Sequence, residues 1–216
     1  MKVLNLYAGI GGNRKNWTDV SVTAVELDPQ LAAIYSENFP QDIVVVGDAH
    51  QYLLDHYKEF DFIWSSPPCQ SHSSFRQNIC VRFRGTPAVF PDMRLYQEVL
   101  FLRHNAECLW TVENVKPYYK PLIDPDAVLQ RHLIWSNFEV SQSDQFAAIK
   151  IRRAQIPDLE QALGFSLKEC NIPNKRQVLR NCVDPNLGEH ILKAARSLLQ
   201  RKAKISKARK NGKGIG

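Results

Sequence analysis

The sequence predicts an α/β protein with a Rossmann-like, mostly parallel sheet flanked by helices. Short apolar runs alternate with segments of helical pattern over about the first 140 residues, as in sheets built from strand–helix units. The first apolar run leads directly into a glycine-rich turn, which is how nucleotide-binding α/β units begin. Polar residues follow several runs, so we expect them to meet at the sheet edge where such folds bind ligands.

Six apolar runs are expected to form strands, because each is short and bounded by polar or turn residues. They are residues 2–7, 20–28, 42–50, 60–64, 107–115 and 129–140. Helices are expected at residues 29–38, 51–60, 91–106 and 157–165, and in the segment that ends near residue 200. The length of 216 residues suits one domain with a sizeable core, predicted over residues 1–200.

The net charge of +6 is concentrated at the C-terminus. Residues 201–216 contain no acidic residue and seven basic ones, namely Arg201, Lys202, Lys204, Lys207, Arg209, Lys210 and Lys213. Without these seven charges, residues 1–200 carry a net charge of −1. A basic tail of this kind commonly contacts nucleic acid, and a solvated, frayed terminus is the alternative interpretation.

The five cysteines show no paired metal spacing, and their odd number argues against a disulfide framework. No apolar run approaches the roughly 18 residues that a membrane span needs. The N-terminal apolar run passes straight into glycines, which differs from the layout of a signal peptide. We therefore expect a cytoplasmic protein in a reducing compartment, with no metal and no membrane partner.

The turn AGIGGNR is the first candidate ligand-binding segment. Gly9, Gly11 and Gly12 allow the backbone to approach a ligand closely, although three glycines alone are a weak signal. Glu26 ends the second predicted strand, where a carboxylate can accept hydrogen bonds from two ribose hydroxyls. Asp48 ends the third, where it can contact a ligand, cap the next helix, or do both.

The motif SSPPCQS, residues 65–71, follows the apolar run that ends at Trp64. Pro67 and Pro68 end this strand and stiffen the backbone, which places Cys69 just beyond the sheet edge. A cysteine at such an edge can act as a nucleophile if its thiolate is stabilised. An isolated cysteine is more often structural, so the assignment depends on its neighbours.

Further polar candidates follow the later strands. Glu113 and Asn114 come at the end of the fifth predicted strand, and the sixth carries Arg131. Since the carboxyl ends of parallel strands share one edge, we expect these side chains to lie close to Cys69.

Taken together, these motifs resemble those of the DNA (cytosine-5) methyltransferases. The similar segments are LYAGIGGNR, VELD, GDA, PPCQS, DMR, ENV, LEQALGF and RNCV, which occur in the family order between residues 4 and 183. The combination of PPCQ and ENV behind the glycine turn is the most specific part. The resemblance implies a Rossmann-like methyltransferase fold, with S-adenosyl-L-methionine as methyl donor, S-adenosyl-L-homocysteine as product and double-stranded DNA as substrate.

The same motifs imply the site residues. The resemblance assigns the cofactor site to Tyr7, Ala8, Gly9, Gly11, Gly12, Glu26, Leu27, Asp48, Ala49, Pro67, Asn181 and Val183. It assigns catalytic roles to Cys69, Glu113 and Arg131.

These three catalytic residues fit the chemistry of the reaction. Cytosine C5 is a weak nucleophile, and addition of the Cys69 thiolate at C6 makes it enamine-like. Glu113, for which partial burial predicts a raised pKa, would hydrogen-bond or protonate N3. Arg131 would stabilise charge at O2 or fix the Glu113 carboxylate. The target base must leave the duplex to reach such a site.

The sequence departs from the family pattern in three places. The family usually has two arginines spaced Arg-x-Arg, whereas QRHLI supplies only Arg131, so Arg131 or His132 would contact the cytosine O2. Arg180 replaces a glycine. The target-recognition domain is missing or reduced to about residues 141–156, as in the small enzymes of phages and mobile elements, where restriction-modification is the expected context.

The loop from Ser71 to Pro91 is expected to face DNA. It interleaves Arg76, Arg82 and Arg84 with phenylalanines, a composition that suits phosphate contact and insertion into a base stack. An ordinary mobile loop with an apolar anchor is the alternative. The other predicted DNA-binding residues are Gln70, Ser71, Arg152 and Arg153.

Three rival functions stay open at this point. The nearest is a tRNA cytosine-5 methyltransferase, because that branch resembles the family closely. A catalytically inactive nucleic-acid-binding relative is the second, and an adenine amino-methyltransferase is disfavoured because the fourth strand leads into a cysteine motif. Without a recognition domain, we expect a sequence context of about two to three bases. The oligomeric state is open.

Overall fold

The computed structural model describes residues 1–142 and 154–212. In this part of the chain a seven-stranded sheet has the order β3-β2-β1-β4-β5-β7-β6. The strands are β1 (Lys2–Leu6), β2 (Ser21–Glu26), β3 (Ile43–Val46), β4 (Phe62–Ser65), β5 (Leu109–Val115), β6 (Ala127–Leu129) and β7 (His132–Ser136). The neighbours from β3 to β5 pair in parallel, and β7 is antiparallel to both β5 and β6. The predicted mostly parallel α/β fold is thus confirmed.

The sixth predicted strand, residues 129–140, needs correction. It forms a tight hairpin in which β6 ends at Leu129 and β7 begins at His132. Gln130 has a φ of 54°, a left-handed conformation that reverses the chain in two residues. Arg131 therefore lies in the hairpin turn, and His132 is the first residue of β7. The apolar pattern concealed the turn because it contains no glycine or proline.

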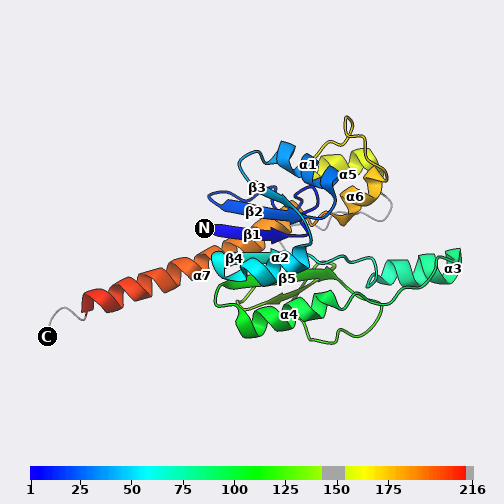
Figure 1. Cartoon of the computed structure of the whole chain (residues 1–216). Coiled ribbons are helices and arrows are strands. Elements are labelled where there is room, and N and C mark those ends of the chain that lie inside the picture. Colours follow the sequence, from blue (N-terminus) through cyan, green and yellow to red (C-terminus); the bar gives the residue numbers. More distant parts are fainter. Residues whose placement is uncertain (143–153, 213–216) are drawn as a thin grey trace.

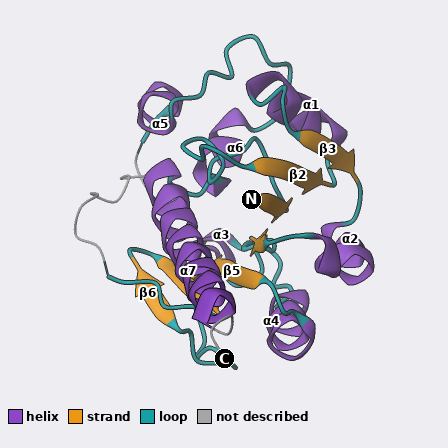
Figure 2. Cartoon of the chain, turned by 90° about the vertical axis from the view of Figure 1, so that its left-hand side faces the viewer, coloured by secondary structure: helices purple, strands orange, loops and turns teal. Residues whose placement is uncertain are grey.

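Helices cover both faces of the sheet (Figure 2). They are α1 (Pro29–Asn38), α2 (Ala49–His56), α4 (Arg94–Asn105), α5 (Ile156–Leu163), α6 (Lys175–Asn181) and α7 (Pro185–Gly212). Helix α1 starts where Asp28 accepts a hydrogen bond from the Gln30 backbone N–H and Pro29 occupies the first turn. Helix α6 was not predicted, and α7 continues through Arg201 without a break.

The core is divided by the sheet, because successive strand residues point to opposite faces. Val3 belongs to the cluster that packs against Leu187 and Ile191 of α7. Leu4, the next residue, belongs to the cluster that packs against Leu53 of α2 and the apolar face of α4. A third cluster joins α1 to α5 and α6. These contacts fix the sheet edge on which the candidate site is built.

Two segments project from this body (Figure 1). The first is the arm, residues 71–91, which contains the π-helical turn η2 (Arg76–Val81) and the short helix α3 (Arg82–Arg84). The second is the C-terminal part of α7, which extends away from the sheet at the other end of the molecule. In the described part of the chain, none of the helices has both the length and the apolar character that a bilayer span requires.

Candidate active site

A cavity of about 590 Å³ lies at the carboxyl edge of the parallel strands. Its wall is formed by the glycine turn after β1, the ends of β2 and β5, the start of β7, the start of α2, the Cys69 loop and the segment around α6. The sequence-predicted residues from the two ends of the chain therefore share one cavity, as expected for the ligand edge of a doubly wound sheet.

The glycine turn and Glu26 form one corner of this cavity. The Gly9 backbone N–H donates to Glu26 Oε2 at 2.7 Å, and the Asp28 N–H donates to Oε1 at 2.9 Å. Both carboxylate oxygens are thereby fixed, and each retains a free acceptor direction for a ligand hydroxyl. Ala8 and Leu27 line the cavity beside this corner.

Two of the predicted glycines serve different purposes. Gly12 lines the cavity and lies against the chain near α6, where an added Cβ would come within 2.6 Å of the Val183 carbonyl oxygen. Gly11 has a φ of 90° and faces Phe39, whose ring would lie 2.2 Å from an added Cβ. Gly11 thus lies behind the cavity wall and supports the packing of α1 rather than facing a ligand.

Asp48 has both of the roles that its position suggested. Its Oδ1 accepts hydrogen bonds from the backbone N–H groups of His50 and Gln51, which caps α2. Asp48 and Ala49 also line the cavity, and the Arg94 guanidinium lies 3.9 Å from Asp48 Oδ2. This end of the cavity is polar and partly exposed, so it suits a ligand with hydrogen-bonding edges.

Cys69 lies at the opposite end of the cavity, on the loop beyond β4. The loop is held in place because the Ser73 and His72 N–H groups donate to the Cys69 carbonyl, and Pro67 O accepts from Asn114 Nδ2. Burial, and then the Glu113 charge, raise the pKa of the Cys69 thiol to about 11, while the Arg131 charge acts in the other direction. The thiol is therefore protonated at neutral pH without a ligand.

Glu113 corrects one prediction. Burial alone would raise the pKa of this carboxyl, as expected from the sequence, but the net pKa is lowered. The largest effect that lowers the pKa comes from His132, whose Nδ1 contacts Glu113 Oε1. The Ser66 hydroxyl, which donates to Oε2 at 3.0 Å, and the Arg131 charge lower it further. Glu113 is therefore a carboxylate at neutral pH, which suits accepting hydrogen bonds from a base better than donating one.

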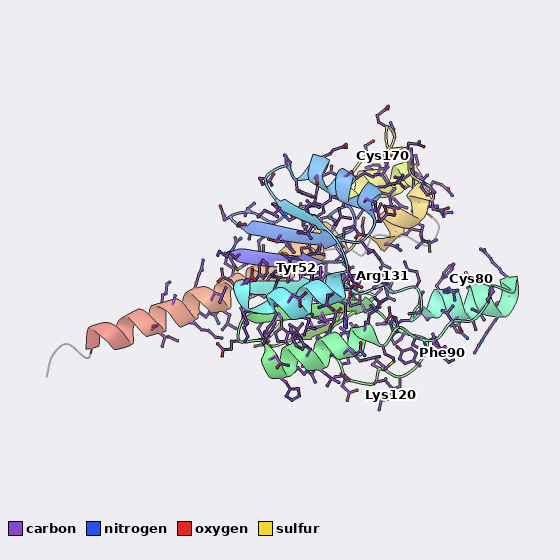
Figure 3. The ribbon with its side chains drawn as sticks, in the orientation of Figure 1. Tyr52, Cys80, Phe90, Lys120, Arg131 and Cys170 are labelled. Atoms are coloured by element: carbon purple, nitrogen blue, oxygen red, sulfur yellow. The ribbon has the colours of Figure 1, made fainter. Side chains whose placement is uncertain are left out.

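Arg131 extends from the hairpin turn toward the segment around α6. Its Nη2 lies 3.5 Å from the carbonyl oxygen of Arg180, and both residues line the cavity. Figure 3 places Arg131 at the end of the sheet from which the arm with Cys80 and Phe90 projects. Asn181 and Val183 follow Arg180 along the same wall. Arg180 thus replaces the expected glycine without closing the cavity.

The arm connects to this site at its base and is exposed at its tip. Gln70 lines the cavity, and Ser71 Oγ accepts a hydrogen bond from the Asp92 N–H. Arg180 lies 5.3 Å from the centre of the Phe75 ring. Farther out, Phe90 is 96% exposed.

The predicted arm arginines lie away from the cavity. Arg76 donates to the Pro87 carbonyl oxygen at 3.2 Å, and Arg82 and Arg84 belong to the exposed part of the arm. The predicted DNA-binding residues Arg152 and Arg153 lie outside the described residues.

The sequence reasoning missed several residues of the cavity. Ser66 and Arg94 were inside quoted motifs, but nothing in those motifs indicated their contacts. Ser66 becomes interpretable only through its position beside Glu113, which depends on the pairing of β4 with β5. Asn114 was noted at a strand end, and the structure gives it the role of anchoring the Cys69 loop.

Comparisons with known proteins agree with this geometry. Residues 1–92 match the family model of C-5 cytosine-specific DNA methylases. A tRNA (cytosine(38)-C(5))-methyltransferase of Spodoptera frugiperda is 33% identical over 76 residues. The chain is thus similar to the cytosine-5 methyltransferases over the segment that holds the glycine turn and the Cys69 loop. The match with the Spodoptera protein covers 32% of this chain and 23% of that protein, so the chain spans about a quarter of this relative's length.

A solved structure supports the fold over nearly the whole chain. The Entamoeba histolytica methyltransferase EhMeth aligns with 92% of this chain and 98% of its own, with a TM-score of 0.54 and 11% identity. Since the identity is low, this likeness concerns the fold alone. Within the described residues, no group of three or more His, Cys, Asp or Glu side chains is placed to hold a metal ion.

Proposed function

We propose that this chain is a cytosine-5 methyltransferase, which transfers a methyl group from S-adenosylmethionine to cytosine C5 in DNA through a covalent adduct with Cys69. The observation that carries the proposal is that Cys69, Glu113 and Arg131 line the same cavity as Glu26 and Asp48, the first three beside β4, β5 and β7 and the other two beside β2 and β3. A methyl donor and a base can therefore be held against one another. We place this reaction in the cytoplasm.

The cofactor end of the cavity suits S-adenosylmethionine. Glu26 keeps free acceptor positions for ribose hydroxyls, and Asp48 is partly exposed for an adenine edge. Gly9, where an added Cβ would meet nothing within 4 Å, leaves room for close approach of a ligand to the backbone. When bound, S-adenosylmethionine supplies an electrophilic methyl group. In this proposal the cofactor contacts residues of this chain alone, and the reaction uses no metal.

At the other end, each side chain has a separate task. Cys69 Sγ forms a bond to C6, which moves the electron pair of the C5–C6 double bond so that C5 becomes nucleophilic. The Glu113 carboxylate accepts a hydrogen bond from the N4 amino group of the base. N3, which has no hydrogen in cytosine, takes up the proton that the Cys69 thiol loses when the bond to C6 forms. The Arg131 guanidinium stabilises negative charge at O2. Loss of the C5 proton and release of Cys69 restore the aromatic ring.

Nucleic-acid binding is assigned to the arm and the basic C-terminus. The exposed Arg82 and Arg84 suit phosphate contacts, and the exposed Phe90 suits insertion beside a displaced base. Because the base must be flipped out of a duplex, an exposed aromatic side chain on the arm is a useful wedge.

A tRNA substrate is the second candidate. It is favoured by the identity with the Spodoptera tRNA methyltransferase, which covers part of the motif region. A tRNA presents unpaired loop bases, so it would require less distortion than duplex DNA. The double-stranded substrate is retained as the first candidate because the matched family model is that of DNA methylases.

The test is methyl transfer from labelled S-adenosylmethionine to duplex DNA and to tRNA, with products identified by nucleoside mass spectrometry. We expect 5-methylcytosine in DNA from the wild-type chain and none from Cys69→Ala. Cys170→Ala is the matched control, because Cys170 lies in the α1–α5–α6 cluster and not on the cavity. A 5-fluorocytosine duplex should trap the wild-type chain covalently. Methylation of tRNA alone would establish the second candidate instead.

A further inference from the structure

The contact between Glu113 and His132 follows from strand register. In the antiparallel pair β5–β7, Val115 lies opposite His132 and Glu113 lies opposite Ile134. Glu113 and His132 are therefore diagonal neighbours on the same face of the sheet, within reach of long side chains. His132 Nδ1 contacts Glu113 Oε1, and the two side chains are 3% and 5% exposed. Strand pairing and burial thus hold the two side chains together in the cavity wall.

The other carboxylate oxygen is fixed by a directional chain. Trp64 Nε1–H donates to Ser66 Oγ at 2.7 Å, and Ser66 Oγ lies 3.0 Å from Glu113 Oε2. Indole nitrogen can only donate, so Ser66 accepts there and directs its own hydrogen at Glu113. Oε2 therefore acts as an acceptor.

The hydrogen-bond donors and acceptors around Glu113 determine which nitrogen of His132 carries a hydrogen. With both oxygens of Glu113 accepting, the facing Nδ1 of His132 must carry a hydrogen. A proton on Oε2 would displace the Ser66 hydroxyl, and a proton on Oε1 would require Nδ1 to lose its hydrogen. Other charged or titratable groups facing the pair are Arg131 in the hairpin turn and Cys69 on its loop.

We propose that His132 is a positioning residue for Glu113: its Nδ1–H holds Oε1 so that an ionised carboxylate is turned toward the target base. This inference rests on the proposed function and deepens it, because it assigns to an imidazole the task of fixing the carboxylate, which was one of the two alternative roles expected for Arg131. It also explains how Glu113 stays ionised although it is buried, as its lowered pKa indicates.

The first test is a double-mutant cycle with Glu113→Gln. His132→Ala should lower kcat by about 10- to 100-fold, a part of the effect of a well-placed acid–base group. The KM for S-adenosylmethionine should not change. In the Glu113→Gln background, His132→Ala should have less than a twofold further effect. If it slows that background as much as the wild type, His132 acts on the base directly and the proposal is overturned.

The conservative variant separates position from charge. In His132→Asn the amide nitrogen can take the place of Nδ1 but carries no charge, so kcat should recover severalfold relative to His132→Ala. The matched control is His56→Asn, which makes the same change at a surface contact of the same kind, His56 Nδ1 to Glu59 Oε1 at 2.8 Å. This control should keep the wild-type rate. Equal rates for His132→Asn and His132→Ala would argue against a positioning role.

The second test does not require activity. The titration of the Glu113 carboxyl carbon is followed by NMR in selectively labelled protein. Its midpoint should move to higher pH in His132→Asn, because burial raises the pKa of Glu113 and the substitution removes the His132 charge that lowers it. An unchanged midpoint would overturn the proposal. If the wild-type chain methylated no nucleic acid, the proposed function would fail while this titration still decided the role of His132.

Discussion

The phenolic hydroxyl of Tyr7 donates a 2.5 Å hydrogen bond to Oε1 of Glu98, a residue that is 1% exposed. The same carboxylate contacts Ser65 Oγ at 2.5 Å and His50 Nδ1 at 2.9 Å. Burial, followed by the nearby Glu98, raises the pKa of Tyr7, so its hydroxyl stays a donor in the physiological range. One side chain of α4 therefore ties together the residue before the glycine turn, the last residue of β4 and the start of α2.

Removing this carboxylate should destabilise the fold. Glu98→Ala leaves two hydroxyls and an imidazole without their buried acceptor, so we expect a loss of about 3–5 kcal/mol in the free energy of unfolding. Urea denaturation measures it. The control is Glu107→Ala, an exposed glutamate near the end of α4, which should change stability by less than about 0.5 kcal/mol. Similar losses in both variants would contradict this account.

The contact with His50 makes stability depend on pH. The hydrogen bond that His50 donates to Glu98 raises the pKa of His50 above its ordinary value of 6.5, against the smaller effect of burial. A raised pKa in the folded state means that the stabilisation is fully present below about pH 6.5 and is lost as pH rises through the raised value. The difference in unfolding free energy between the wild type and His50→Asn should therefore shrink above that value. A constant difference from pH 5 to 9 would contradict the linkage.

The order and type of most elements could be predicted from the sequence, because apolar runs and turn signals are local. The parallel sheet, the cavity at its carboxyl edge and the capping role of Asp48 follow from such signals. The hairpin at Gln130 could not be seen, since its left-handed residue is neither glycine nor asparagine. That missed turn explains why Arg131 was expected on a strand.

The ionisation of Glu113 was predicted wrongly for a related reason. Burial is readable from an apolar run, but the partner that overcomes it is not. His132 reaches Glu113 only because β7 pairs with β5 in one particular register. Likewise, Gly11 and Gly12 are equivalent in the sequence, but one packs against Phe39 and the other lines the cavity. Long-range pairing decides such details.

The thiol of Cys69 should respond in opposite directions to its two charged neighbours. Its pKa of about 11 is raised by burial and then by Glu113, and lowered by Arg131. At pH 8, alkylation of Cys69 by iodoacetamide should therefore be faster in Glu113→Gln and slower in Arg131→Gln than in the wild type. In the wild type the rate should rise about tenfold per pH unit below that value. Peptide mass spectrometry measures it; equal rates in all three proteins would contradict the assigned charges.

The basic end of the chain should contribute affinity without sequence preference. In the described part of this segment, Arg201, Lys202 and Lys204 are exposed on α7, which projects from the body. Deleting residues 202–216 removes six of the seven tail charges. Because each neutralised phosphate contributes about 0.9 to the slope of log affinity against log salt, the slope should become less steep. An unchanged slope in a filter-binding titration would exclude the tail from the contact.

The sequence specificity of the enzyme should be low, because few residues are available to contact base edges. Each good pair of a side chain with a base edge gives about 1–3 kcal/mol of discrimination, and a site of several base pairs needs a number of them. Between β7 and α5 this chain has only residues 137–155, where the family resemblance implies a recognition domain. The arm and this connection can supply one or two base contacts, since the arm's arginines suit phosphates.

We therefore expect methylation in a context of about two to three bases around the cytosine. Bisulfite sequencing of DNA from cells that express the chain measures the context directly. The context should stay the same when residues 202–216 are deleted, because phosphate contacts position the protein but do not read sequence. A strict motif of five or more bases, obtained with the chain shown to act alone as a monomer, would mean that the arm reads bases far more extensively than its exposed arginines and Phe90 suggest.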